Sequence, residues 1–234
     1  VQPGTRLGKL RPGLATEIGY STAVISSAGH DTACAIAAVP STDDDYIYLS
    51  SGTWSLMGVL LDQPIISAES MVAEMTNEGG FDGKIRFLKN IVGLWLVQEC
   101  RRQWAREGNK YSYADLTEMA AKAPPLAALI EPGESRFLAP KNMPRAIQDY
   151  CRESGQGVPE SKGAIIRSVL ESLALEYRSV AEQIENLTGK AYPVIHIIGG
   201  GTQNKLLNQF AANATGKSVV AGPIEATAIG NILI

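Results

Sequence analysis

The sequence has few cysteines and histidines, no excess of positive charge and no long apolar run. Its three cysteines, Cys34, Cys100 and Cys151, lie far apart, which fits reduced thiols better than disulfides or a metal cluster. A net charge of −3 gives no basic surface for nucleic acid. No stretch approaches the roughly 20 apolar residues that cross a bilayer, and no secretory signal is recognisable. We therefore expect a cytoplasmic globular protein with no nucleic-acid or membrane partner.

The chain is long enough for a sizeable core, in one or two domains, at 234 residues. Val1 is not an initiating methionine, and Glu225–Ile234 has a helical pattern without a stop signal. The sequence is therefore interpreted as part of a longer protein. The acidic turn Asp43–Asp45 is the best candidate for an internal domain boundary.

The stretch Ser26–Ala33 places Asp31 at a strand-to-helix junction. The β-type run Thr22–Ile25 precedes it, and a helical run of small residues, Ala33–Val39, follows. The unpaired N–H groups and the dipole at a helix start favour an anion. Asp31 is therefore either a helix cap or a catalytic carboxylate at the mouth of a cleft, and position alone leaves both interpretations open.

Two glycine-containing turns follow strand-like runs. The turn between Tyr46–Ser51 and Leu56–Leu61 contains Gly52 and Thr53, whose N–H and hydroxyl groups can hold a phosphate. The second turn, Gly199–Asn204, follows the apolar run Val194–Ile198 and begins with three glycines. Its backbone lets a ligand approach closely, although a turn formed only for packing is the alternative.

Asn90 is predicted to cap a helix from Ile91 to about Arg106. The expected apolar stripe of this helix starts at Ile91, Leu94 and Trp95 and continues at Gln98. A glutamine on a buried stripe needs a polar partner or a ligand. Further predicted elements are helices at 13–19, 113–122, 145–154 and 165–187 and a strand at 84–88.

Several motifs occur in an order that resembles a known family. They are Gly29-His-Asp-Thr-Ala33, Ser51-Gly-Thr-Trp54, Thr76-Asn-Glu-Gly-Gly80, Leu88-Lys-Asn-Ile-Val-Gly-Leu-Trp95 and Ile198-Gly-Gly-Gly-Thr-Gln-Asn204. This set is similar to the C-terminal half of the rhamnulokinases, within the FGGY sugar-kinase family related to actin and Hsp70. The resemblance runs through nearly the whole chain.

The resemblance implies an α/β fold of RNase H-like (actin-like ATPase) type. The chain would be the C-terminal domain of a two-domain sugar kinase that works around a cleft. Residues 1–42 would be the tail of the first, sugar-side domain and carry the catalytic aspartate, and residues 43–234 would form the nucleotide-binding domain. The missing N-terminal domain would be the chief partner, so the isolated fragment is expected to be inactive.

The resemblance also implies roles for single residues. Asp31 would be the catalytic base, and His30, Asp31, Thr32 and Asn90 would contact the sugar. The residues implied to bind the nucleotide are Thr53, Gln98, Gly199, Gly200, Gly201 and Asn204. No protein ligand for a metal is implied, because Mg²⁺ would be carried by the phosphates of ATP.

The implied reaction moves the γ-phosphoryl group of ATP to the 1-hydroxyl of L-rhamnulose, giving L-rhamnulose 1-phosphate in rhamnose catabolism. Two other interpretations stay open. One is a kinase of the same family for another ketose or polyol. The other is a non-catalytic ATP-binding module like actin, which the Gly-His-Asp-Thr motif disfavours because a scaffold needs no base beside a sugar.

Overall fold

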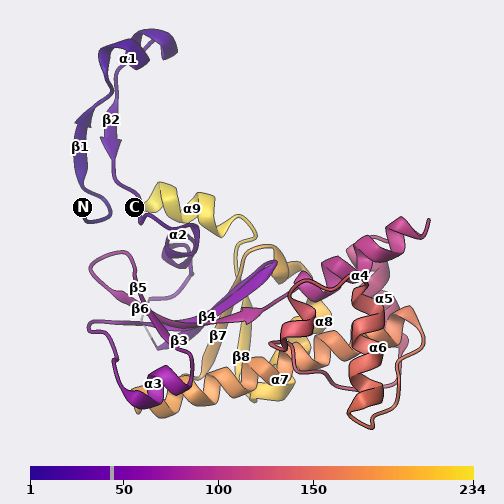
Figure 1. Ribbon diagram of the computed structural model, residues 1–234. Helices are drawn as coiled ribbons and strands as arrows, with labels where there is room; N and C mark the ends of the chain where they lie inside the picture. Colours follow the sequence, from indigo (N-terminus) through magenta and orange to yellow (C-terminus); the bar gives the residue numbers. More distant parts are fainter. Residues whose placement is uncertain (43–44) are drawn as a thin grey trace.

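The computed structural model describes residues 1–42 and 45–234 and centres on a six-stranded mixed sheet (Figure 1). The strand order is β5-β6-β4-β3-β7-β8. The strands are β3 (Tyr46–Ser51), β4 (Trp54–Leu61), β5 (Thr76–Gly79), β6 (Ile85–Val92), β7 (Val194–Ile198) and β8 (Ser218–Ala221). The pairs β3–β4, β4–β6 and β5–β6 are antiparallel. β7 pairs parallel with β3 and with β8.

The long helix α7 (Lys162–Thr188) packs along one face of this sheet (Figure 1). Its buried residues recur at helical spacing, and Ser161 caps its start by accepting a hydrogen bond from the Ala164 amide. Gly189 ends the helix with a left-handed conformation (φ 67°), as the sequence predicts. Around α7 lie α4 (Trp95–Arg106), α5 (Tyr113–Lys122), α6 (Met143–Glu153) and α8 (Lys205–Thr215).

The opposite face of the sheet is covered by α2 (Asp31–Ala37) and α9 (Ala226–Leu233) (Figure 1). Ile36 of α2 and Ala226 of α9 join Tyr46, Tyr48 and other strand residues in one buried cluster. The two helices approach very closely, because a Cβ built at Gly230 would lie 1.7 Å from the Cys34 carbonyl oxygen. A glycine is therefore required at this crossing.

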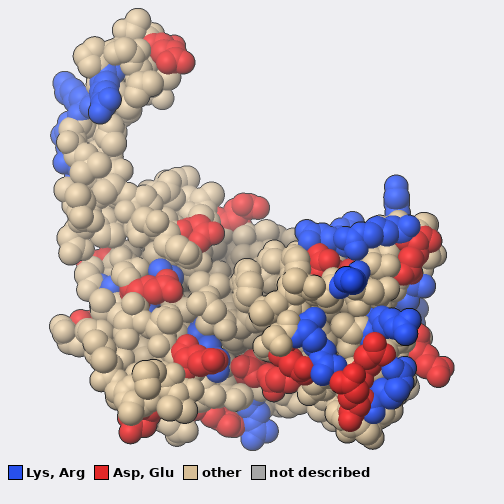
Figure 2. All heavy atoms as spheres, viewed as in Figure 1, with Lys and Arg blue, Asp and Glu red and all other residues tan. Residues whose placement is uncertain are grey.

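Residues before α2 form an arm that extends from the sheet (Figure 1). It consists of β1 (Arg6–Lys9) and β2 (Ala23–Ile25), paired antiparallel, and α1 (Pro12–Ile18). All residues of α1 are described, and none is buried. Figure 2 shows basic side chains along this arm. Of the predicted segment 1–42, α2 packs on the sheet whereas the arm does not.

The domain boundary predicted after residue 42 remains a prediction. The acidic turn Asp43–Asp45 on which it rests falls mostly outside the described residues. One short α-helix and two 3-10 helices complete the description. They are α3 (Ala68–Val72) and the 3-10 helices η1 (Ser135–Phe137) and η2 (Gly200–Gln203). No helix in the described part of the chain has both the length and the apolar character to cross a membrane.

The prediction that Asn90 caps a helix is wrong. Asn90 lies inside β6, opposite Leu56 of β4, and the strand continues through Ile91 and Val92 because these β-branched residues favour pairing. Helix α4 starts only at Trp95. Its buried side also differs from the predicted stripe, and consists of Leu96, Val97, Glu99, Cys100 and Trp104.

We predict that Gly230→Ala destabilises the protein. The new methyl group has no space beside the Cys34 carbonyl, so α2 and α9 must move apart, which costs about 1–3 kcal/mol as overpacking usually does. Urea denaturation should show a lower midpoint, and mapped thiol labelling should show faster reaction of Cys34, which is buried beneath α9.

The matched control is Gly13→Ala in α1, where no described heavy atom lies within 4 Å of the new Cβ. Alanine there should leave the midpoint unchanged or raise it slightly, since alanine favours helix. An unchanged midpoint and unchanged Cys34 labelling in Gly230→Ala would contradict the close-crossing argument.

Candidate functional site

A cavity of about 670 Å³ opens where the carboxyl ends of β3 and β7 meet. These strands run parallel, so the turns that follow Ser51 and Ile198 lie at the same edge of the sheet. The lining residues are His30, Asp31, Thr32, Ser50, Ser51, Gly52, Thr53, Trp54, Leu56, Asn90, Gly199 and Gly200.

Asp31 reaches this cavity from the first turn of α2. His30 is the helix cap and Asp31 is the first helical residue, so the side chain of Asp31 is free to face the cavity. Its Oδ1 accepts a hydrogen bond from the Thr32 amide at 2.7 Å and lies 3.1 Å from His30 Nδ1. The side chain is 74% exposed, so a ligand can reach the carboxylate.

The floor of the cavity is a row of side chains across three strands. Ser50 of β3 pairs with Leu56 of β4, and Leu56 pairs with Asn90 of β6, so the three side chains share one face. The position of Asn90 thus comes from strand register rather than from helix capping. It places the Asn90 amide in the same cavity as Asp31.

The turn between β3 and β4 is fixed by the start of α4. The Gly52 and Thr53 carbonyls accept hydrogen bonds from the Leu94 and Trp95 amides at 3.1 and 2.9 Å. The Thr53 hydroxyl is 3.1 Å from Gln98 Nε2. Gln98 therefore finds a polar partner in this exposed threonine, and both side chains face a second cavity.

This second cavity has a volume of about 950 Å³ and lies between α4, α5 and the start of α8. It shares Gly52, Thr53 and Gly200 with the first cavity, so the two meet at the two glycine turns. Gly201 and Asn204 also line it. Asn204 has a structural role as well, because its Oδ1 caps α8 by accepting a hydrogen bond from the Leu207 amide at 3.1 Å.

The three glycines of the second turn meet different constraints. Gly199 has φ 85°, and a Cβ at Gly201 would lie 2.0 Å from Ser51 Oγ, so the fold itself requires glycine at both positions. Gly200 is exposed, and no described heavy atom lies within 4 Å of its Cβ position. Backbone conformation and packing therefore explain why glycine occurs at positions 199 and 201, but they do not explain the glycine at position 200.

All the residues predicted for the site line one of the two cavities. The first holds His30, Asp31, Thr32, Asn90, Thr53, Gly199 and Gly200, and the second holds Thr53, Gln98, Gly200, Gly201 and Asn204. Their roles stay predictions. Sequence reasoning missed Ser50 and Leu56, which could have been found from the strand register, and Trp54, a residue that is 48% exposed beside Thr53.

The donor set at the site does not form a cage for a metal ion. Among the described residues, no group of three or more histidine, cysteine or acidic side chains could hold a metal. Asp31 is the carboxylate that lines the first cavity.

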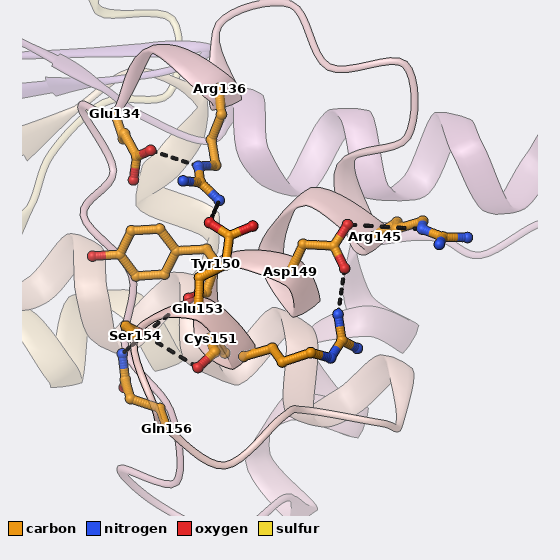
Figure 3. Close-up of polar contacts among 10 residues, drawn as sticks. Glu134, Arg136, Arg145, Asp149, Tyr150, Cys151, Glu153, Ser154 and Gln156 are labelled. Carbon is orange, nitrogen blue, oxygen red and sulfur yellow. Dashed lines mark hydrogen bonds and ion pairs between the residues drawn. The ribbon is translucent and has the colours of Figure 1, made fainter.

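A separate polar cluster joins α6 to the loop before it and lines neither cavity (Figure 3). Arg136 pairs with Glu134 at 2.5 Å and with Glu153 at 2.8 Å, and its guanidinium lies over the Tyr150 ring. Asp149 pairs with two arginines of the same helix. Such pairs, partly or fully in water, contribute little to stability.

The same fold occurs in solved carbohydrate kinases. A gluconate kinase from Lactobacillus acidophilus superposes with a TM-score of 0.71 at 16% identity, covering 100% of this chain and 46% of that one. A glycerol kinase from Plasmodium falciparum, solved with ADP, gives 0.67 at 13% identity, covering 98% of this chain and 45% of that one. The chain thus has the actin-like ATPase fold of one domain of a two-domain sugar kinase, as predicted.

Sequence comparisons agree with the fold. The C-terminal domain of the FGGY family of carbohydrate kinases matches residues 47–234, and the chain belongs to this family. It is 49% identical over 235 residues to a rhamnulokinase of Bacteroides thetaiotaomicron and 47% identical over 231 residues to one of Halalkalibacterium halodurans. These matches cover 100% and 99% of the chain but 48% of each relative, so the chain spans about half their length.

We predict that Gly200→Val weakens nucleotide binding and leaves the fold intact. The valine side chain has space within the protein but would project where the two cavities meet. In the full-length protein, calorimetric titration should give a Kd for ATP–Mg²⁺ raised at least tenfold, roughly 1.4 kcal/mol. Circular dichroism should be unchanged.

The matched comparison is Gly201→Val, which should lose stability because its Cβ clashes with Ser51. A folded Gly200→Val protein with the original Kd would mean that the turn serves packing alone.

Proposed function

We propose that the full-length protein is an ATP-dependent ketose kinase that phosphorylates L-rhamnulose at its 1-hydroxyl, in the cytoplasm. The observation that carries the proposal is the first cavity, in which the exposed Asp31 carboxylate and the glycine turns at Thr53 and Gly200 share one space. Relatives named rhamnulokinase, 42–49% identical to this chain, support the choice of sugar.

In this proposal Asp31 is the general base. A sugar hydroxyl is a poor nucleophile, and a carboxylate within hydrogen-bond reach can orient it and accept its proton as the new bond forms. The Thr32 amide holds the Asp31 carboxylate in place by donating a hydrogen bond to its Oδ1 at 2.7 Å, and the His30 ring lies beside it. Thr32, His30 and Asn90 are proposed to contact the sugar.

The second cavity is proposed to hold the nucleotide. Its junction with the first cavity contains Thr53 and Gly200, so phosphates that extend from it would point at Asp31. The Thr53 hydroxyl and the amides of the turns can donate hydrogen bonds to phosphate oxygens. Gln98, Gly199, Gly201 and Asn204 complete the proposed contact set. Mg²⁺ bound to the phosphates would neutralise charge that builds up during transfer.

The half of the relatives' length that this chain does not span is proposed to supply the facing wall. The exposed arm is a suitable contact for it, since Leu7, Leu14 and Tyr20 are at least half exposed. Residues 1–42 would then belong to both sides of the cleft, with the arm on the sugar-side domain and α2 on the sheet. The Asp31 carboxylate would lie between the two domains.

We expect Asp31→Ala in the full-length protein to lower kcat by about 10²-fold or more, because loss of a general base typically costs 10²–10⁴. The Kd for ATP should change little, since Asp31 does not line the second cavity. A coupled ADP assay with L-rhamnulose measures the first quantity and calorimetry the second. Asp31→Asn, nearly the same shape, should lose activity equally.

Asp149→Ala is the control, because this half-buried aspartate on α6 lines neither cavity. It should retain normal turnover. Normal kcat in Asp31→Ala would remove Asp31 from the mechanism. A panel of other ketoses and polyols, run with the unchanged protein, distinguishes L-rhamnulose from the alternative acceptors, and absence of turnover with every sugar would favour a non-catalytic ATP-binding module.

The 234-residue chain by itself should bind nucleotide weakly and transfer no phosphoryl group. It retains the turns at Thr53 and Gly200, but transfer depends on positioning worth effective molarities of ~10⁵–10⁸ M, which one wall cannot supply. Titration of ATP–Mg²⁺ followed by the coupled assay measures both. Turnover at the rate of the full-length protein would contradict the proposal that transfer requires the facing domain. Complete absence of nucleotide binding would weaken the assignment of the second cavity.

A further inference from the structure

A pair of buried hydroxyl groups lies beneath the turn between β3 and β4, and the mechanism above does not use it. Ser55 Oγ and Tyr177 OH are 2.8 Å apart, and both residues are 0% exposed. Ser55 is the second residue of β4, directly after the turn, whereas Tyr177 lies in the middle of α7, 122 positions away. The bond therefore joins the turn to the longest helix of the core.

The surroundings leave the Ser55 hydroxyl little freedom. A Cβ at Gly93 would lie 2.6 Å from Ser55 Oγ, so the segment that leads into α4 closes one side. Tyr177 closes another side from α7. Burial raises the pKa of Tyr177 to about 12, so its phenol keeps its proton and can act as a hydrogen-bond donor near neutral pH.

The same small region holds the second glycine turn. Ser51, which pairs with Ser55 across the hairpin, is approached so closely by Gly201 that a Cβ there would lie 2.0 Å from Ser51 Oγ. The hairpin turn, the start of α4 and the glycine turn after β7 therefore converge on two serines. The hairpin turn is linked to α7 by the hydrogen bond between Ser55 and Tyr177.

We propose that Tyr177 is a positioning residue for the turn Gly52–Thr53. Its hydrogen bond to Ser55 fixes the turn on α7, so that the Thr53 hydroxyl and the turn amides face the junction of the two cavities. The inference rests on the proposed function, because it takes this turn to be the contact for the nucleotide phosphates. Tyr177 itself lines neither cavity, and its hydroxyl is hydrogen-bonded to Ser55.

A positioning role is distinct from a purely structural one. Phosphoryl transfer depends on the alignment of donors with the phosphates, so a small displacement of the turn lowers transfer more than it lowers stability. The sugar-side residues His30 and Asn90 lie on other segments and should be unaffected. The signature is a lower kcat and a higher KM for ATP, with an unchanged KM for the sugar.

The test is Tyr177→Phe in the full-length protein, which keeps the buried ring and removes only the hydroxyl. We expect kcat/KM for ATP to fall about three- to tenfold, in line with the net value of one hydrogen bond. Ser55→Ala should give the same loss, and the double variant should add little to either, since both remove one interaction.

The matched control is Tyr48→Phe. Tyr48 is also 0% exposed, but it lies on the opposite face of β3, in the cluster that packs against α2, and its hydroxyl has no hydrogen-bond partner among the described residues. Its removal should leave kcat/KM unchanged. An equal loss in Tyr48→Phe and Tyr177→Phe would overturn the inference, because any buried hydroxyl would then matter.

Thr53→Val separates failure of this inference from failure of the proposed function. If Thr53→Val weakens ATP use while Tyr177→Phe alters only the unfolding midpoint, Tyr177 is merely structural and the inference is wrong. If Thr53→Val also leaves kcat/KM unchanged, the turn is not the phosphate contact and the proposed function of the site fails. Ser55→Ala tests the same bond if Tyr177→Phe does not fold.

Discussion

The parallel pairing of β3 with β7 is the constraint on which the site depends. It brings Ser51 and Ile198 to one edge of the sheet, although they are far apart in sequence, and so places two glycine turns side by side. Helix α2 then covers the sheet face next to this edge and brings Asp31 to the same opening. A break in this pairing would separate the carboxylate from both turns.

The elements that the sequence predicts well are those with an unambiguous pattern. β3, β7 and α5 have the predicted bounds, because apolar runs or helical spacing are ended by glycine, proline or serine. The helix start predicted at Asn90 is wrong, because asparagine is a strong helix cap but the β-branched residues that follow it favour a strand. Only the pairing with β4, a long-range contact, shows that the strand continues.

Several residues that line the two cavities could be predicted from the sequence, but the geometry of the cavities could not. The resemblance to sugar kinases supplied Asp31, Thr53 and Gly200 from motif order alone. The sequence could not reveal that Gln98 meets Thr53 or that α9 crosses α2 at Gly230, because both contacts join distant segments. Local patterns also could not distinguish the three glycines from one another. In the structure, Gly201 packs closely against Ser51, whereas Gly200 does not.

The polarity of the cavity floor depends on which alternate positions of β3, β4 and β6 face it, because the floor is the row Ser50–Leu56–Asn90. Side chains alternate along a strand, so a single inserted or deleted residue in β6 would turn Asn90 toward α7 and bring Ile91 or Lys89 opposite Leu56. One such change would place an amide in the core and a hydrocarbon or an ammonium group in the opening. Length changes in this strand should therefore be tolerated only in steps of two residues.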